Sequence, residues 1–170
     1  THGIDRPIVV GQMLGEVAPE KMITTGGAKA GDDLIVTKGI ALEGTTIIAS
    51  ERADMLTAFL TCEEIAGCAE LLRSPGISVV RDAQIALDAG EVHALHDPTE
   101  GGLATGLHEL AHASGTGVCI NMAALPMVPS CEKICTHLQL DPLGLIASGA
   151  LLIAAASHST DAILRAFVEA

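Results

Sequence analysis

Aromatic residues are nearly absent from this sequence of 170 residues, which has two Phe and neither Trp nor Tyr. A buried core must therefore come from aliphatic side chains, and hydrophobic residues at 49% of the chain are enough to build one domain. Sites that bind single-stranded nucleic acid by stacking bases are not expected, because such sites need aromatic faces.

Basic residues are also scarce. Nine Lys and Arg stand against twenty-one Asp and Glu, which gives a formal net charge of −12. An acidic surface repels nucleic acids and anionic membranes, so we expect neither as a partner. A nucleotide is not excluded, because a divalent cation can bridge its phosphates to carboxylates.

Long apolar runs and paired cysteine motifs are missing as well. No apolar run reaches the roughly 18 residues of a membrane-spanning helix. The five cysteines are odd in number and form no C-x-x-C pair, so neither a disulfide framework nor a structural zinc site is expected. This cysteine usage indicates a reducing compartment, and we expect a cytoplasmic protein.

Short apolar runs alternate with stretches of helical periodicity, which predicts an α+β domain of layered helices and sheet. The expected strands are residues 7–17, 34–37, 91–96, 117–121 and 150–155. The expected helices are residues 45–52, 61–74, 82–87, 130–138 and 161–168, together with a helix that follows a turn within residues 96–111 and ends near residue 114. Thr61 and Glu64 have the spacing of a capping box at the start of the second helix.

The most informative stretch is residues 96–111, HDPTEGGLATGLHELA, which joins an expected strand to an expected helix. As a helix start, it offers Asp97 as the N-cap, Pro98 in the first position and Glu100 as the partner in a capping box. A helix that begins in this way needs no ligand.

Gly101 and Gly102 do not fit that simple cap. A glycine in a helix costs about 0.5–1 kcal/mol relative to Ala, so another constraint must require the pair. Either a ligand approaches the backbone here or the helix packs tightly against the sheet. The free N–H groups at a helix N-terminus bind anions, and Mg²⁺ would reconcile a phosphate with the carboxylates of Asp97 and Glu100.

A competing interpretation comes from His108, Glu109 and His112, which satisfy the H-E-x-x-H pattern of zinc hydrolases. In such enzymes the two histidines bind Zn²⁺ and the glutamate is the general base. The pattern fixes only three residues, so chance matches are common.

The direction of the side chains weighs against zinc. With Leu103 set at 0° and about 100° per residue, Leu107 falls at about 40° and Leu110 at about −20°, which defines the buried stripe. His108 falls at about 140° and His112 at about 180°, away from that stripe. The pattern therefore favours a solvated polar face over a catalytic zinc site.

The stretch DPTEGGLATGLHELA resembles the D-x-[ST]-x-G-G-[LF] signature in the carboxy-terminal domains of the aminoimidazole-ribonucleotide synthetase related, or PurM-like, superfamily. Three further blocks agree in order and spacing: GDDLIVTKGIALEGTTIIA at 31–49, LPMVP at 125–129 and DPLGLIASGALLIAA at 141–155. The DPT and DPL forms are most similar to the hydrogenase-maturation (HypE) branch. The resemblance covers residues 7–168.

The resemblance implies an ATP-using enzyme of two domains. The amino-terminal domain forms a dimer and binds the nucleotide through acidic, Mg²⁺-holding motifs. The carboxy-terminal domain, a mixed sheet covered by helices and partly ferredoxin-like, closes over the ligand. We therefore expect residues 1–17 to be the last strand of a missing ATP-binding domain and residues 18–170 to be the carboxy-terminal domain.

The resemblance also implies partners and activity. Hydrogenase-maturation proteins, a second copy and the missing domain are the expected partners, and ATP with Mg²⁺ is the expected cofactor pair of the full-length protein. The isolated chain is expected to hold neither tightly and to hydrolyse no ATP. The alternative is a non-catalytic binding or regulatory module that keeps only the fold.

The site residues implied by the resemblance lie in two loops. Asp97, Thr99 and Glu100 would face the ligand, with Asp97 also meeting Mg²⁺, and the backbone N–H groups of Gly101 and Gly102 would reach a phosphate.

Lys38 and Gly44 would line the same cleft from the neighbouring loop, the alternative for Lys38 being a solvated loop lysine. His96 is either a proton carrier or simply the end of a strand, and we favour the second. Residues 147–149 read Ala-Ser-Gly where the family often has Asn-Glu-Gly.

Overall fold

The computed structural model describes residues 3, 5 and 7–170. Its strands are β1 (Asp32–Val36), β2 (Val92–His96) and β3 (Leu152–Ala156), in the order β1-β3-β2. Its helices are α1 (Leu42–Glu51), α2 (Ala53–Leu56), α3 (Cys62–Glu70), α4 (Val80–Ala89), α5 (Gly102–Ser114), α6 (Pro129–Leu138) and α7 (Thr160–Glu169). The expected α+β class is confirmed.

The apolar run of β3 makes it the central strand. β3 pairs with β1 from Asp32↔Ala156 to Val36↔Leu152, and with β2 on its other side. Both ladders are antiparallel, whereas a mixed sheet was expected. A strand buried on both faces reads as a continuous apolar run, and residues 152–155 of β3 are all buried.

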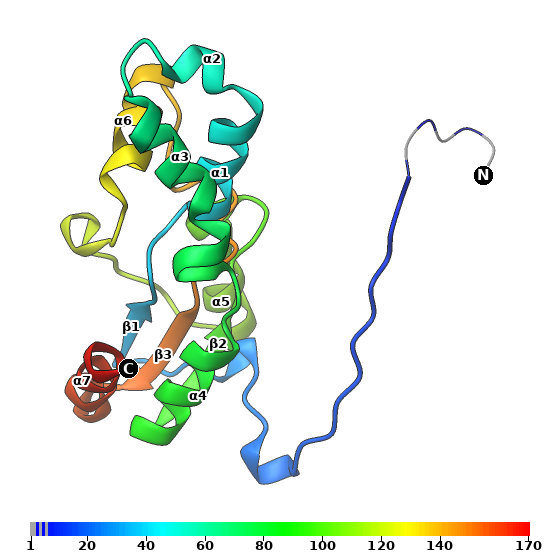
Figure 1. The fold of residues 1–170 in the computed structure, drawn as a ribbon. Coiled ribbons are helices and arrows are strands. Elements are labelled where there is room, and N and C mark those ends of the chain that lie inside the picture. Colours follow the sequence, from blue (N-terminus) through cyan, green and yellow to red (C-terminus); the bar gives the residue numbers. More distant parts are fainter. Residues whose placement is uncertain (1–2, 4, 6) are drawn as a thin grey trace.

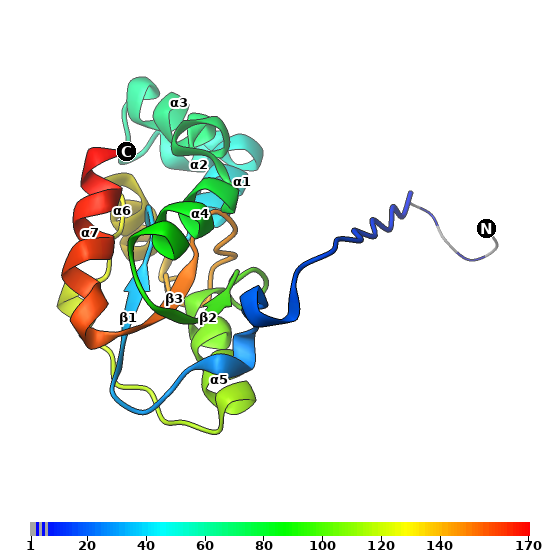
Figure 2. The same ribbon diagram turned by 90° about the horizontal axis from the view of Figure 1, so that it is seen from below.

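Helices cover both faces of the sheet (Figure 2). Ile153 points to the side of α4 and α7, where it packs with Ala86 and Ile163. Leu152 points to the opposite side, where it packs with Leu103 and Leu110 of α5. The alternation of side chains along one strand therefore separates two cores.

Helices α1, α2, α3 and α6 form a second group, at the top of Figure 1. Leu56, Cys68 and Ile134 are buried at its centre. The capping box is confirmed, because Thr61 Oγ1 accepts from the N–H of Glu64 at 3.1 Å and Glu64 Oε2 accepts from the N–H of Thr61 at 2.8 Å.

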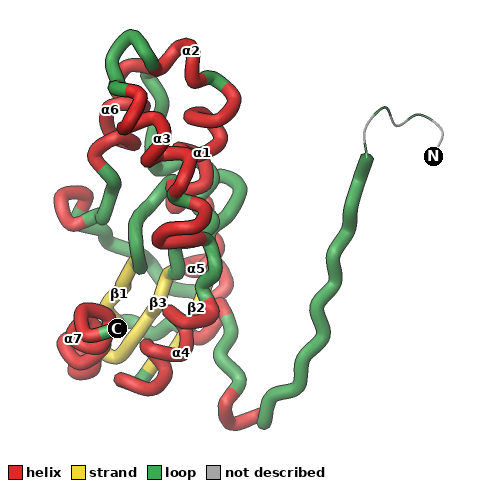
Figure 3. Tube along the Cα trace, in the orientation of Figure 1, coloured by secondary structure: helices red, strands yellow, loops and turns green. Residues whose placement is uncertain are grey.

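Residues 7–17 are not a strand, contrary to the expectation. They run away from the body of the domain as an exposed, irregular segment (Figures 1 and 3), with Val9 at 92% and Met13 at 94% exposure. Apolar residues favour a strand, but a strand also needs a neighbour, and none of the described residues supplies one. The rest of the expected remnant, residues 1, 2, 4 and 6, lies outside the described residues.

The segment 117–121 is likewise not a strand, although its sequence predicted one. Within the described residues, no helix is both long and apolar enough to cross a membrane.

Candidate functional site at the β2–α5 junction

Helix α5 follows a turn, as expected, and does not begin at a cap formed by Asp97. Its first residue is Gly102 and its N-cap is Gly101, with no side-chain cap, so the capping box expected from Asp97 and Glu100 is wrong. Residues 97–101 instead form a turn in which Pro98 is fully buried. The turn leaves Asp97, Thr99 and Glu100 exposed at the surface.

Both glycines are required by the backbone. Gly101 has φ +76° and Gly102 has φ +65°, values that side-chain-bearing residues rarely adopt. A Cβ atom on Gly102 would overlap the carbonyl oxygens of Leu143 and Leu145, and one on Gly101 would overlap the Thr105 hydroxyl. Tight packing therefore accounts for the glycine pair without a ligand.

Backbone hydrogen bonds tie this turn to the segment 141–149. The N–H of Ala104 donates to the carbonyl of Leu143 at 3.0 Å, and the N–H of Ala147 donates to the carbonyl of Thr99 at 3.2 Å. The N–H of Gly102 donates to the same Thr99 oxygen at 3.0 Å. Gly102 thus uses its N–H inside the turn, and Gly101 is the better candidate for a backbone contact with a phosphate.

The same segment also contacts the start of α1. The N–H of Gly44 donates to the carbonyl of Ile146 at 3.1 Å, and a Cβ on Gly44 would lie 3.1 Å from that of Leu145. Residues 143–147 therefore lie between the first turns of α1 and α5. Three of the four family-like blocks meet at this place.

Asp97 and Glu100 are the exposed titratable groups of the turn, and the pKa of Asp97 is shifted. The Asp97 carboxyl is partly shielded from water although the residue is exposed, and this desolvation raises its pKa above the usual range. Nearby His96 and Lys38 lower the pKa, while Glu43 raises it. Within the described part of the chain, no hydrogen-bond partner holds the Asp97 side chain.

Lys38 is not a solvated loop lysine, because an ion pair holds its side chain. Its Nζ atom lies 3.1 Å from Asp82 Oδ2 and donates to the carbonyl of Ser78 at 2.8 Å. Both side chains of the ion pair are mostly buried, 14% exposed for Lys38 and 12% for Asp82. Lys38 therefore anchors the loop before α1 to the start of α4, and acts on Asp97 only through its charge.

His96 is a strand-end residue with a structural role. Its Nε2 lies 2.9 Å from Glu109 Oε2 on α5, and its Nδ1 lies 3.2 Å from the hydroxyl of Thr25. The imidazole thus links three segments at the end of β2.

The zinc interpretation does not survive the structure. His108 and His112 are exposed with ring centroids 6.0 Å apart, as their positions on the helix predicted. The third residue of the pattern, Glu109, is paired with His96 instead. Among the described residues, no group of three potential ligands is arranged to hold a metal.

The sequence did not reveal two features of the junction, the Asp82 partner of Lys38 and the wall formed by residues 143–147. Asp82 lies on α4, far from Lys38 in sequence, and nothing in either residue pointed to the other. The wall was visible only as a family-like block without a role. A hollow of about 760 Å³ lies elsewhere in the domain, beside β1.

The AIR synthase related protein, C-terminal domain, matches residues 29–170. The chain belongs to this family. The match spans every strand and helix from β1 to α7, and the junction described above lies inside it.

Two curated proteins with similar sequences both carry the name carbamoyl dehydratase HypE. Carbamoyl dehydratase HypE of Cupriavidus necator is 31% identical over 153 residues, which are 90% of this chain and 40% of HypE. Carbamoyl dehydratase HypE of Escherichia coli (strain K12) is 34% identical over 137 residues, 81% of this chain and 37% of HypE. The chain therefore spans about two fifths of the length of these relatives.

Solved structures with a similar fold also include HypE. HypE of E. coli has a TM-score of 0.69 at 28% identity and covers 87% of this chain and 42% of its own. A HypE solved in complex with ATP has a TM-score of 0.68 at 26% identity, covering 91% and 43%. Thiamine-monophosphate kinase of Stenotrophomonas maltophilia, at 19% identity and a TM-score of 0.69 over 90% and 48%, shares the fold.

Proposed function

We propose that this chain is the carboxy-terminal domain of a HypE-like, ATP-dependent enzyme, and that residues 97–101 form the ligand-facing edge of its active site. The observation that supports this most is the convergence of three family-like blocks on the wall 143–147. The turn at this place leaves Asp97 exposed, and among the described residues no hydrogen bond holds its carboxylate.

The chemistry of the turn fits Mg²⁺ and a nucleotide in part. Asp97 and Glu100 offer carboxylate oxygens and Thr99 offers a hydroxyl, and Mg²⁺ is bound through one or two carboxylates together with waters and phosphate oxygens. Desolvation raises the pKa of Asp97, and a bound cation would offset that cost of keeping the carboxylate ionised. Gly102, in contrast, has no N–H left for a phosphate.

The residues of the junction bind and position the cation and the nucleotide. None of them forms a covalent bond with the substrate. When bound, ATP supplies the phosphoryl group that activates an oxygen atom of an amide-like substrate. Asp97 holds the cation, and Thr99 and Gly101 contribute a hydroxyl and an N–H toward the phosphates. In such reactions positioning and charge neutralisation supply most of the catalysis.

The complete active site needs more than this chain. The relatives are more than twice as long, and we propose that an amino-terminal domain carries the acidic nucleotide-binding motifs. Residues 7–17, apolar and exposed, are the segment that would join it. A cytoplasmic location, a homodimer and contacts with other hydrogenase-maturation proteins belong to the same proposal, and one relative was solved as a HypE–HypF complex.

An ATP-hydrolysis assay tests the proposal. The full-length protein should hydrolyse ATP with Mg²⁺, Asp97→Asn should reduce the rate strongly, and the 170-residue chain alone should show no activity. Asp88→Asn, at an exposed position on α4, is the matched control. Metal-dependent ATP hydrolysis by the 170-residue chain alone would refute the need for an amino-terminal domain. An Asp97→Asn protein with the wild-type rate would refute the role of the turn.

One observation favours a second candidate, a module that keeps the fold without catalysis. Internal packing explains both glycines, and the N–H of Gly102 donates to the carbonyl of Thr99 within the turn. Residues 147–149 also lack the Asn-Glu pair that is frequent in the family. A module of this kind predicts a full-length protein that neither binds nor hydrolyses ATP through this edge.

A further inference from the structure

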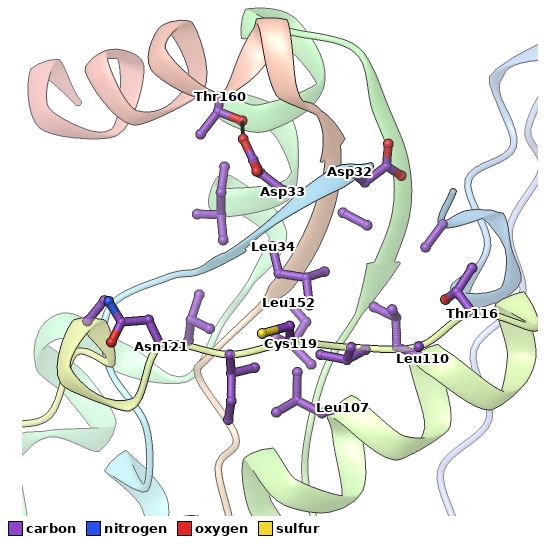
Figure 4. Close-up of a pocket in the computed structure, with 18 of the residues that line it drawn as sticks. Asp32, Asp33, Leu34, Leu107, Leu110, Thr116, Cys119, Asn121, Leu152 and Thr160 are labelled. Carbon is purple, nitrogen blue, oxygen red and sulfur yellow. Dashed lines mark hydrogen bonds between the residues drawn. The ribbon is translucent and has the colours of Figure 1, made fainter. Parts of the chain in front are cut away.

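A slot of about 760 Å³ runs along the edge strand β1 and is lined in part by Leu152 and Ala154 of β3 (Figure 4). Consecutive residues line both of its walls, residues 28–36 on one side and 116–121 on the other. Leu107, Leu110 and Leu152 form the floor between the walls. The volume lies within the range of about 300–1,000 Å³ that is typical of ligand sites.

Both walls carry unpaired backbone. β1 is an edge strand, so one side of its ladder has no neighbour. Among the described residues, the N–H and carbonyl groups of residues 117–120 make no backbone hydrogen bond. An aliphatic ligand would leave these polar groups unsatisfied, whereas an extended peptide offers donors and acceptors along its edges.

The side chains around the slot specify which peptide fits. Leu34 points to the floor beside Leu107 and Leu152, so an entering strand would place apolar side chains there (Figure 4). Asp33 is exposed at one end, where its carboxylate accepts from the hydroxyl of Thr160 at 2.7 Å. A basic residue on the peptide would meet this charge, in a chain with a net charge of −12.

We propose that this slot docks an extended peptide of a partner protein, which adds to β1 as a fourth strand. The peptide has apolar residues at alternate positions and a basic residue opposite Asp33. Main-chain hydrogen bonds to β1 give the affinity, and the apolar floor with the acidic end gives the selectivity.

The rate at which Cys119 is alkylated can report on binding in the slot, because this thiol is exposed and lines the slot. Cys62 is the other exposed thiol, whereas Cys68, Cys131 and Cys135 are buried. In a Cys62→Ser background, iodoacetamide therefore reports on access to Cys119. The probe is a capped peptide of alternating valine and threonine with one lysine at its end.

At ten times its dissociation constant, this peptide should slow alkylation of Cys119 about tenfold, because about one slot in ten stays open. The same peptide with every backbone amide N-methylated can donate no hydrogen bond to a strand from either edge, and it should not protect Cys119. Replacing its lysine with glutamate should weaken binding, and Asp33→Asn should remove that difference. Protection by the N-methylated peptide, or none by the parent, would overturn the proposal.

Amide hydrogen exchange of the free protein tests the competing possibility. If residues 117–121 themselves closed on β1, the amides on the outer edge of β1 would be protected without any peptide, and the slot would not be a docking site. We expect those amides to exchange rapidly in the free protein and to become protected when the peptide is added.

Discussion

The N–H of Ala147 donates to the carbonyl of Thr99 at 3.2 Å, and the N–H of Gly102 donates to that same oxygen at 3.0 Å. One carbonyl thus fixes the turn before α5 to the segment that also supports the start of α1. The shape of the candidate site depends on this contact, so substitutions that separate the turn from the wall 143–147 should affect stability as well as ligand binding.

Gly102→Ala should destabilise the domain by about 1–3 kcal/mol, because it adds a strained positive φ and an overlap with two carbonyl oxygens. Gly67→Ala is the matched control, since this glycine lies in α3 with open space around it. The control should stabilise the domain by about 0.4–1 kcal/mol. Urea denaturation followed by circular dichroism measures both, and equal stabilities of the two variants would contradict the packing account.

The pair formed by Lys38 and Asp82 should be a real contributor to stability. Its side chains are mostly buried, so removing one partner leaves a charge without compensation, and a double-mutant cycle with Lys38→Met and Asp82→Asn should give a coupling of about 1–3 kcal/mol. The exposed pair Arg73 and Glu70 is the comparison, with an expected coupling of about 0.5 kcal/mol or less. Similar coupling energies for the two pairs would mean that burial does not strengthen the Lys38–Asp82 ion pair.

His93 should make stability depend on pH. Its hydrogen bond to Glu91 and its contact with Asp32 raise its pKa above 6.5, against burial and the charge of Lys29, which lower it. The stabilisation is therefore complete below the unfolded pKa of about 6.5 and is lost as the pH rises through the folded pKa. Unfolding curves at several pH values should show a shallower decline above neutral pH for His93→Asn than for the wild type. His112→Asn, at an exposed position, should keep the wild-type slope; identical slopes for all three proteins would exclude this role of His93.

Local rules predicted the parts of the fold whose causes are local. The capping box of Thr61 and Glu64 forms as expected, because both partners lie within one helical turn. The outward direction of His108 and His112 followed from helical periodicity alone, which already favoured a solvated polar face over a catalytic zinc site.

Predictions failed where a distant segment decides the outcome. The sequence around Asp97 matches a capping box, but Leu143 and Leu145 approach the backbone at Gly102 and move the helix start to that residue. The β-rich pattern of 117–121 gives no strand, because a ladder forms between two segments and β1 lies across the slot. The sequence did not predict the pairing of Lys38 with Asp82 either, because the two residues are far apart in the chain and meet only in the fold.

The affinity of the full-length protein for Mg²⁺–ATP, measured by titration calorimetry with the wild type and with Asp97→Asn, tests the central claim most directly. If Asp97 faces the nucleotide through the cation, Asp97→Asn should weaken binding about tenfold or more, which equals about 1.4 kcal/mol, while Asp88→Asn should bind as the wild type does. Equal affinities for Asp97→Asn and the wild type would show that the turn before α5 does not face the ligand.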